Sequence, residues 1–146
     1  MRIREFLLVI GFIVFGSFSF SQISFKTGDA SLEAELNILN DEAKADLGAF
    51  KKELAEDFGL AKEKVQHYLE IALEPAEIIL SARIADITGN SVDEVVKRYE
   101  SKKDEGWGKI AKDLGIKPGS PEFHALKGKQ MKGISKGNSN KSKGKK

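Results

Sequence analysis

The sequence predicts an all-α protein: a small helical bundle of stacked helix pairs, about five to six helices, followed by a Lys- and Gly-rich tail. Two observations support this fold class. Apolar residues recur at helical spacing along most of the chain, and glycines or capping residues mark the ends of the periodic segments. The chain also has no cysteine, which excludes disulfides, thiol nucleophiles and cysteine zinc sites. Burial of apolar surface alone must therefore stabilise the fold.

The first segment, residues 1–21, is predicted to be a secretory signal peptide. Arg2 and Arg4 form a positive start, residues 6–15 are almost entirely apolar, and a small-x-small pattern ends at Ser21. The segment is short for a membrane span, which needs about 20 apolar residues. We therefore expect an exported protein, periplasmic or secreted, with no transmembrane anchor after signal cleavage.

After a leader at residues 22–30, one long helix is predicted over residues 31–57. A single apolar stripe supports it, with spacings of three and four residues. Asn40 and Asp41 favour helix caps and could interrupt it, and Gly59 ends it. The stripe consists of Leu32, Leu36, Leu39, Ala43, Leu47, Phe50, Leu54 and Phe58.

A second helix is predicted over residues 61–71 and a third over residues 75–88. Pro75 suits the first position of the third helix, because its missing N–H is not needed there. This helix is apolar almost all round, which is typical of a central buried helix, and Gly89 ends it. Its apolar residues are Ile78, Ile79, Leu80, Ala82, Ile84, Ala85 and Ile87.

Three more helices complete the predicted bundle. The fourth begins at a capping box in which Glu94 follows Ser91 by three residues. The fifth runs from Trp107 to Gly115, and the last covers residues 121–126, after a serine that suits the N-cap. We expect the Trp107 side chain to lie in the core, because it shares an apolar stripe with its neighbours in the fifth helix. If it were exposed, it would instead be a binding anchor.

A weak internal repeat relates two of these helix pairs. Residues 59–70 align with residues 89–100, glycine with glycine and Val65 with Val95. Repeated helix pairs bury their apolar faces by stacking. We expect one helical domain over residues 31–127, closed by the long first helix.

Charge divides the chain into an acidic body and a basic arm. Residues 22–105 carry 11 Lys and Arg against 19 Asp and Glu, a net of −8; residues 106–146 carry 11 against 2, a net of +9. Residues 128–146 contain no acid and little apolar area to offset their ordering entropy, so this tail is predicted to be disordered. The candidate anion-binding residues are Lys127, Lys129, Lys132, Lys136, Lys141, Lys143, Lys145 and Lys146.

Such a tail suits sequence-independent attraction to phosphate-rich or acidic polymers. For an exported chain the partners would be an anionic envelope polymer, an anionic glycolipid, released nucleic acid or an acidic protein. We expect an exported, non-enzymatic interaction protein whose cationic tail contacts anionic surfaces. The competing interpretation is a solubilising tail that has no ligand.

One helical face carries a set of metal-like residues, Glu63, His67 and Glu70, with Glu74 beyond it. Imidazole and carboxylates together can hold a divalent cation, so a metal-binding protein or metal-dependent enzyme is the alternative function. No second histidine accompanies the set, which favours a solvated charged face. We predict no cofactor.

The remaining motifs give no catalytic site. His124 suits a surface or structural histidine better than a general base. The chain has no phosphate loop, nucleophile elbow or zinc-protease helix, so no enzyme is predicted. Residues 108–127 partly match the helix-turn-helix pattern. However, the turn at residues 117–121 is too long and too stiff for that motif, which argues against sequence-specific DNA binding. A small envelope chaperone is a further alternative, and it requires an exposed apolar groove.

The C-terminal part of the domain carries a resemblance. Residues 106–127 read GWGKIAKDLGIKPGSPEFHALK. This stretch resembles the C-terminal signature, GWGxIAKxLGIKPGSxEFHALK, of uncharacterised small exported all-helical bacterial proteins. The segments at residues 75–77 and 91–95 resemble other parts of the same proteins. The resemblance implies export and an all-helical fold, and it transfers no catalytic or binding residue.

Overall fold

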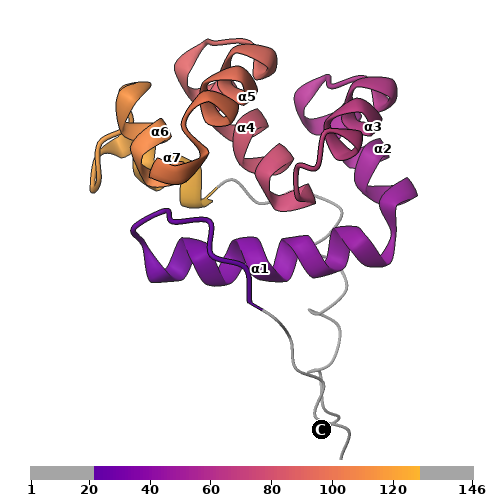
Figure 1. The fold of residues 1–146 in the computed structure, drawn as a ribbon, viewed down its shortest axis with the longest axis horizontal. Helices are drawn as coiled ribbons and strands as arrows, with labels where there is room; N and C mark the ends of the chain where they lie inside the picture. The colour runs from indigo at the N-terminus through magenta and orange to yellow at the C-terminus, as the bar shows by residue number, and fades with distance from the viewer. Residues whose placement is uncertain (1–21, 129–146) are drawn as a thin grey trace, which may run out of the picture.

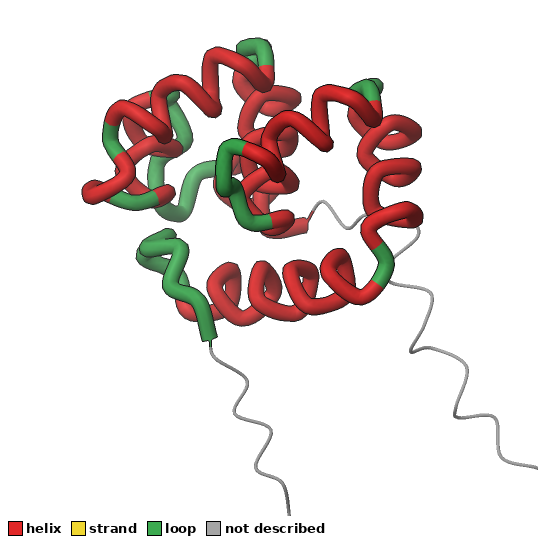
Figure 2. Tube along the Cα trace, turned by 45° about the vertical axis from the view of Figure 1, so that its right-hand side comes forward, coloured by secondary structure: helices red, strands yellow, loops and turns green. Residues whose placement is uncertain are grey.

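A computed structural model describes residues 22–128, which fold into helices and loops without a strand (Figure 2). The predicted all-α fold class is confirmed. The predicted signal peptide at residues 1–21 and the tail beyond Gly128 lie outside the described residues. Among the helices of the described part, none is long and apolar enough to cross a membrane.

The helices form pairs that lie across one long helix (Figure 1). The long helix, α1, lies along one side of the molecule, and α4 is packed against it and against the helices on either side. A short 3-10 helix, η1, connects α5 to α6. The elements are α1 (Ala30–Ala45), α2 (Leu47–Phe58), α3 (Lys62–Glu70), α4 (Pro75–Thr88), α5 (Val92–Ser101), η1 (Lys103–Glu105), α6 (Trp107–Asp113) and α7 (Pro121–Gly128).

Two helix hairpins have the same turn. Gly59 ends α2 with φ 64° and Gly89 ends α4 with φ 76°, both in the left-handed region that glycine adopts without a steric penalty. In each case the next helix begins after a short loop. These hairpins, α2 with α3 and α4 with α5, contain the two segments that the sequence aligned as a repeat.

The predicted single helix over residues 31–57 is wrong in one respect: it is two helices, and the break is at Asp46. This residue has a non-helical backbone, and its side chain accepts the Ala49 N–H at 2.9 Å, which caps α2. The Asn40–Asp41 pair does not interrupt α1. Asn40 is buried instead, and its amide group accepts the Ala76 N–H at 3.0 Å and donates to Glu74 at 2.9 Å.

Helix α4 divides the core. Its residues are buried continuously from Pro75 to Ala85, as the apolar sequence of the third predicted helix indicated. One cluster joins α4 to α1, α6 and α7 through Leu80, Ile84 and Trp107, and the other joins it to α2 and α3. Every other described helix therefore lies against α4 or against a helix that contacts it.

The leader is part of the fold. Glu33 in the first turn of α1 accepts the backbone N–H groups of Phe25 at 2.9 Å and Thr27 at 2.6 Å. The Phe25 side chain is 3% exposed and lies in the core. Residues 22–30, which were predicted to lie outside the helical domain, thus pack onto it, partly through Trp107, which is distant in sequence.

The leader also caps α6. The N–H groups of Trp107 and Gly108, at a helix start where no intrahelical acceptor exists, donate to the carbonyls of Phe25 at 3.0 Å and Lys26 at 2.9 Å. This approach requires glycine on both sides of the indole. A Cβ at Gly106 would lie 2.3 Å from the Lys26 Cβ, and a Cβ at Gly108 would lie 2.5 Å from the Thr27 carbonyl oxygen.

We expect Gly108→Ala to lower the free energy of unfolding by about 1–3 kcal/mol, because the added methyl group would push the leader off α6. Gly48→Ala is the matched control. Gly48 lies in the first turn of α2, where a Cβ meets only an ordinary 3.4 Å contact, and alanine there should stabilise by about 0.5–1 kcal/mol. Urea unfolding followed by circular dichroism measures both. Equal stability of the two variants would contradict the leader contact.

Candidate functional site

A buried carboxylate lies at the centre of the helical body. Glu77 is 8% exposed, and its Oε2 accepts the Glu74 N–H at 2.8 Å, which completes a capping box at the start of α4. Its Oε1 accepts the Trp107 indole N–H at 3.3 Å and the Tyr99 hydroxyl. The Tyr99 and Trp107 rings stack with centroids 4.2 Å apart. Donors within the chain thus engage both oxygens, so this carboxylate connects helices.

A second tyrosine–carboxylate pair ties the two hairpins together. The Tyr68 hydroxyl on α3 donates to Asp93 on α5 at 2.5 Å, and Lys64 forms an ion pair with the same carboxylate. The Lys64 and Tyr68 hydrogen bonds lower the pKa of Asp93. Burial, followed by the adjacent carboxylate, raises the pKa of Tyr68 and of Tyr99 above the usual 10.0.

These two phenols predict a loss of stability at alkaline pH. Because their pKa values are raised on folding, the folded state holds both protons more tightly than the unfolded chain. Their contribution is complete below about pH 10 and declines as the pH rises further. We expect the unfolding free energy, from urea titrations at pH 8 and 11, to fall between these values. The Tyr68→Phe/Tyr99→Phe variant should show a smaller fall, and an equal fall would contradict the assignment.

A buried cation connects α4 to α1 and α7. Arg83 is 0% exposed, and its Nη2 lies 2.8 Å from the Glu35 Oε1 on α1. Its Nη1 donates to the Leu126 carbonyl oxygen at 3.4 Å, near the C-terminal end of α7, where unpaired carbonyls attract a cation. This role was not predicted from the sequence, although Arg83 is the one basic residue of a helix that is mostly apolar.

We expect Glu35→Ala to lower the unfolding free energy by about 1–3 kcal/mol, because it leaves the buried guanidinium without its counter-charge. Arg83→Met removes both the charge and the free-energy cost of its desolvation. Its unfolding free energy should therefore fall less than that of Glu35→Ala. Denaturant titration of both variants at pH 7 tests the order. A Glu35→Ala protein as stable as the wild type would show that the ion pair contributes nothing.

The metal-like residues do not form a ligand cluster. Glu63, His67 and Glu70 are exposed on α3, and Glu70 accepts a hydrogen bond from the Gln66 amide at 2.9 Å. Within residues 22–128, no group of three or more His, Cys, Asp or Glu side chains is positioned to hold a metal ion. His124 is exposed on α7.

The large apolar side chains of the described part are mostly buried. Trp107 is 1% exposed, which confirms its predicted place in the core. The envelope-chaperone alternative requires an exposed apolar groove, and the large apolar side chains exposed in the described part are Ile38, at 59%, and Leu47, at 41%. They lie on different helices, α1 and α2.

Lys127, the first residue of the predicted anion-binding set, belongs to the folded body. Its ammonium lies 3.1 Å from Asp29 and 5.7 Å from the centre of the Phe123 ring. The Leu32 N–H and the Lys127 ammonium lower the pKa of Asp29. The other seven lysines of the set lie beyond Gly128, outside the described residues.

The charges of the body are distributed unevenly. Residues 29–58, which include α1 and α2, carry nine acids against three lysines. Burial raises the pKa of Glu53 on α2, and neighbouring acids, with Asp57 first among them, raise it further. Near α6 the Lys102 and Lys109 ammonium groups both bond Asp113 and lower its pKa to about 2. The α1–α2 side is thus rich in negative charge, and the lysine-rich segment follows α7.

These features define an all-α helical domain with buried polar links and a basic C-terminal extension. Comparison with protein-family models, curated proteins and solved structures found no match. The resemblance in residues 106–127 therefore stays a prediction.

Proposed function

We propose that this chain is an exported, non-enzymatic interaction protein whose lysine-rich C-terminal segment contacts anionic surfaces. The observation that carries the proposal is the composition of residues 129–146, which contain seven lysines and no acid. Clustered ammonium groups attract polyanions without requiring a particular sequence. An anionic envelope polymer, an anionic glycolipid or an acidic protein fits this chemistry. The predicted signal peptide at residues 1–21 supports the export part of the proposal.

The geometry of the body supports an oriented contact. Arg83 and Asp29 both contact the last turn of α7, so the lysine-rich segment begins next to these two contacts. Several body lysines already have carboxylate partners, among them Lys44 with Glu74 and Lys64 with Asp93. The acidic α1–α2 side would be repelled by a negative surface, which favours an approach through the end of α7.

Ending the chain at Gly128 should abolish salt-sensitive retention on heparin and on vesicles of acidic lipid. The deletion keeps Lys127, and with it the Asp29 ion pair. A second variant, with the seven lysines beyond Gly128 changed to glutamine, removes the charge at constant length and should behave like the deletion. Lys112→Gln is the control, because Lys112 is exposed on α6 and its loss should change retention little.

Elution salt from heparin, and the fraction bound to vesicles at increasing ionic strength, give the readout, because ionic contacts weaken as salt screens them. Equal retention of the full chain and the glutamine variant would refute the proposal. Retention that does not respond to salt would refute it as well.

A further inference from the structure

An apolar pocket lies beneath α7. Its walls come from the leader, α1, α4, α6, the loop that follows α6, and α7, and they include Ile84, Trp107 and Ala111. Phe123 and Leu126 of α7 form the cover. As folded, the pocket has a volume of about 20 Å³, roughly the room that one water molecule needs. Its apolar walls give a water molecule few hydrogen-bond partners, so they suit an apolar group better.

The cover packs on α4 through a small apolar face. Leu126 is the buried residue of this eight-residue helix, and Phe123 is half-buried. The Arg83 hydrogen bond to the Leu126 carbonyl is long, at 3.4 Å, and the Lys127–Asp29 ion pair is partly exposed. Elements with few buried contacts open at low free energy. Outward displacement of α7 would extend the pocket without breaking the α1–α4 core.

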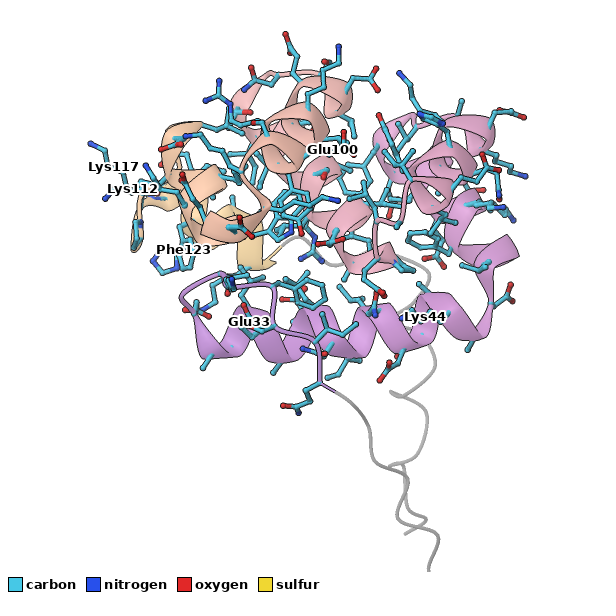
Figure 3. All side chains as sticks on the ribbon, viewed as in Figure 1. Glu33, Lys44, Glu100, Lys112, Lys117 and Phe123 are labelled. Atoms are coloured by element: carbon cyan, nitrogen blue, oxygen red, sulfur yellow. The ribbon has the colours of Figure 1, made fainter. Side chains whose placement is uncertain are left out.

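The mouth of the pocket is basic. Lys127 lies beside Leu126 in the sequence, and its ammonium is 5.7 Å from the centre of the Phe123 ring. Lys117 precedes Pro118, another wall residue. Figure 3 shows Lys112 and Lys117 at the same end of the molecule as Phe123. An apolar interior with ammonium groups at its mouth matches a molecule that has an apolar chain and an anionic head.

We propose that this pocket binds the acyl end of a monomeric anionic amphiphile, of the fatty-acid class, when α7 moves outward. The chain would enter between Ala111 and Phe123, and the carboxylate would take the place of Asp29 at Lys127. This site is separate from the lysine-rich segment beyond Gly128, so it goes beyond the proposed function and does not depend on it.

The single tryptophan of the sequence makes the proposal directly measurable. Trp107 lines the pocket and is 1% exposed, so a bromine atom can quench its fluorescence by contact only from within the pocket. Residues 22–146 would be titrated with a brominated fatty acid below its micelle concentration, with the unbrominated acid as blank. A brominated alcohol of equal length tests the contribution of the head group. We expect saturable quenching by both, with about tenfold weaker binding of the alcohol.

Matched variants separate the pocket from the surface. Ala111→Leu fills the pocket and should weaken binding of the acid by at least about tenfold, whereas Ala125→Leu makes the same change at an exposed position of α7 and should bind as the wild type does. Circular dichroism would confirm folding. If Ala111→Leu fails to fold, Phe123→Ala replaces it; this change widens the cover, and quenching should then saturate at lower concentration.

Three results would overturn the proposal: no quenching by either amphiphile, equal quenching in the wild type and the folded Ala111→Leu protein, or quenching only by brominated lipid in vesicles. The last result would indicate contact with a bilayer surface. Heparin retention, measured in parallel, should be the same for Ala111→Leu and the wild type. The variant with glutamine in place of the tail lysines should still show quenching. The pocket and the lysine-rich segment are therefore tested by independent measurements, and either proposal can fail without the other.

Discussion

The carboxylate of Glu77 fixes how the central helices of this protein meet. A buried carboxylate is strongly unfavourable unless donors surround it, and here the donors come from three places: the start of α4, Tyr99 on α5 and Trp107 on α6. Apolar packing alone specifies a single arrangement of helices less strongly than it stabilises the fold. The Tyr99–Trp107 stack and the shared carboxylate add this specificity, because they are satisfied only in one arrangement. The leader then caps α6, whose position this arrangement sets.

Arg83 makes the same kind of link further along α4. Glu77 and Arg83 are the charged residues among the buried positions of this helix, and each reaches a different set of neighbours. The first connects α4 to α5 and α6, and the second connects it to α1 and α7. The Arg83–Glu35 ion pair adds less stability than its Coulomb attraction suggests, because both groups lose water on burial. Their main effect in this fold is to specify which helices are neighbours, which a helix with apolar residues on every side cannot do.

The features visible in the sequence are those determined locally. Pro75 and Gly89 delimit α4, and the Ser91–Glu94 box starts α5, because caps and stops act within one turn of the chain. The break at Asp46 was missed, since the apolar stripe continues through it. The leader contacts and the roles of Glu77 and Arg83 were missed because their partners lie far away in sequence; Trp107 is 30 residues from Glu77. Likewise, composition reveals the lysine run, whereas only the fold shows that Asp29, 98 residues away, already engages Lys127.

That pairing also determines how the end of α7 can respond to an external anion. Asp29 uses its two carboxylate oxygens for different tasks: Oδ1 accepts the Leu32 N–H at 2.8 Å and caps α1, whereas Oδ2 meets the Lys127 ammonium at 3.1 Å. The ammonium can therefore exchange Asp29 for another anion while the cap of α1 stays in place. Since this ion pair is partly exposed to water, the exchange costs less free energy than breaking a fully buried pair would. The body can thus offer a cation at the edge of the apolar pocket without loosening the helix on which the other helices rest.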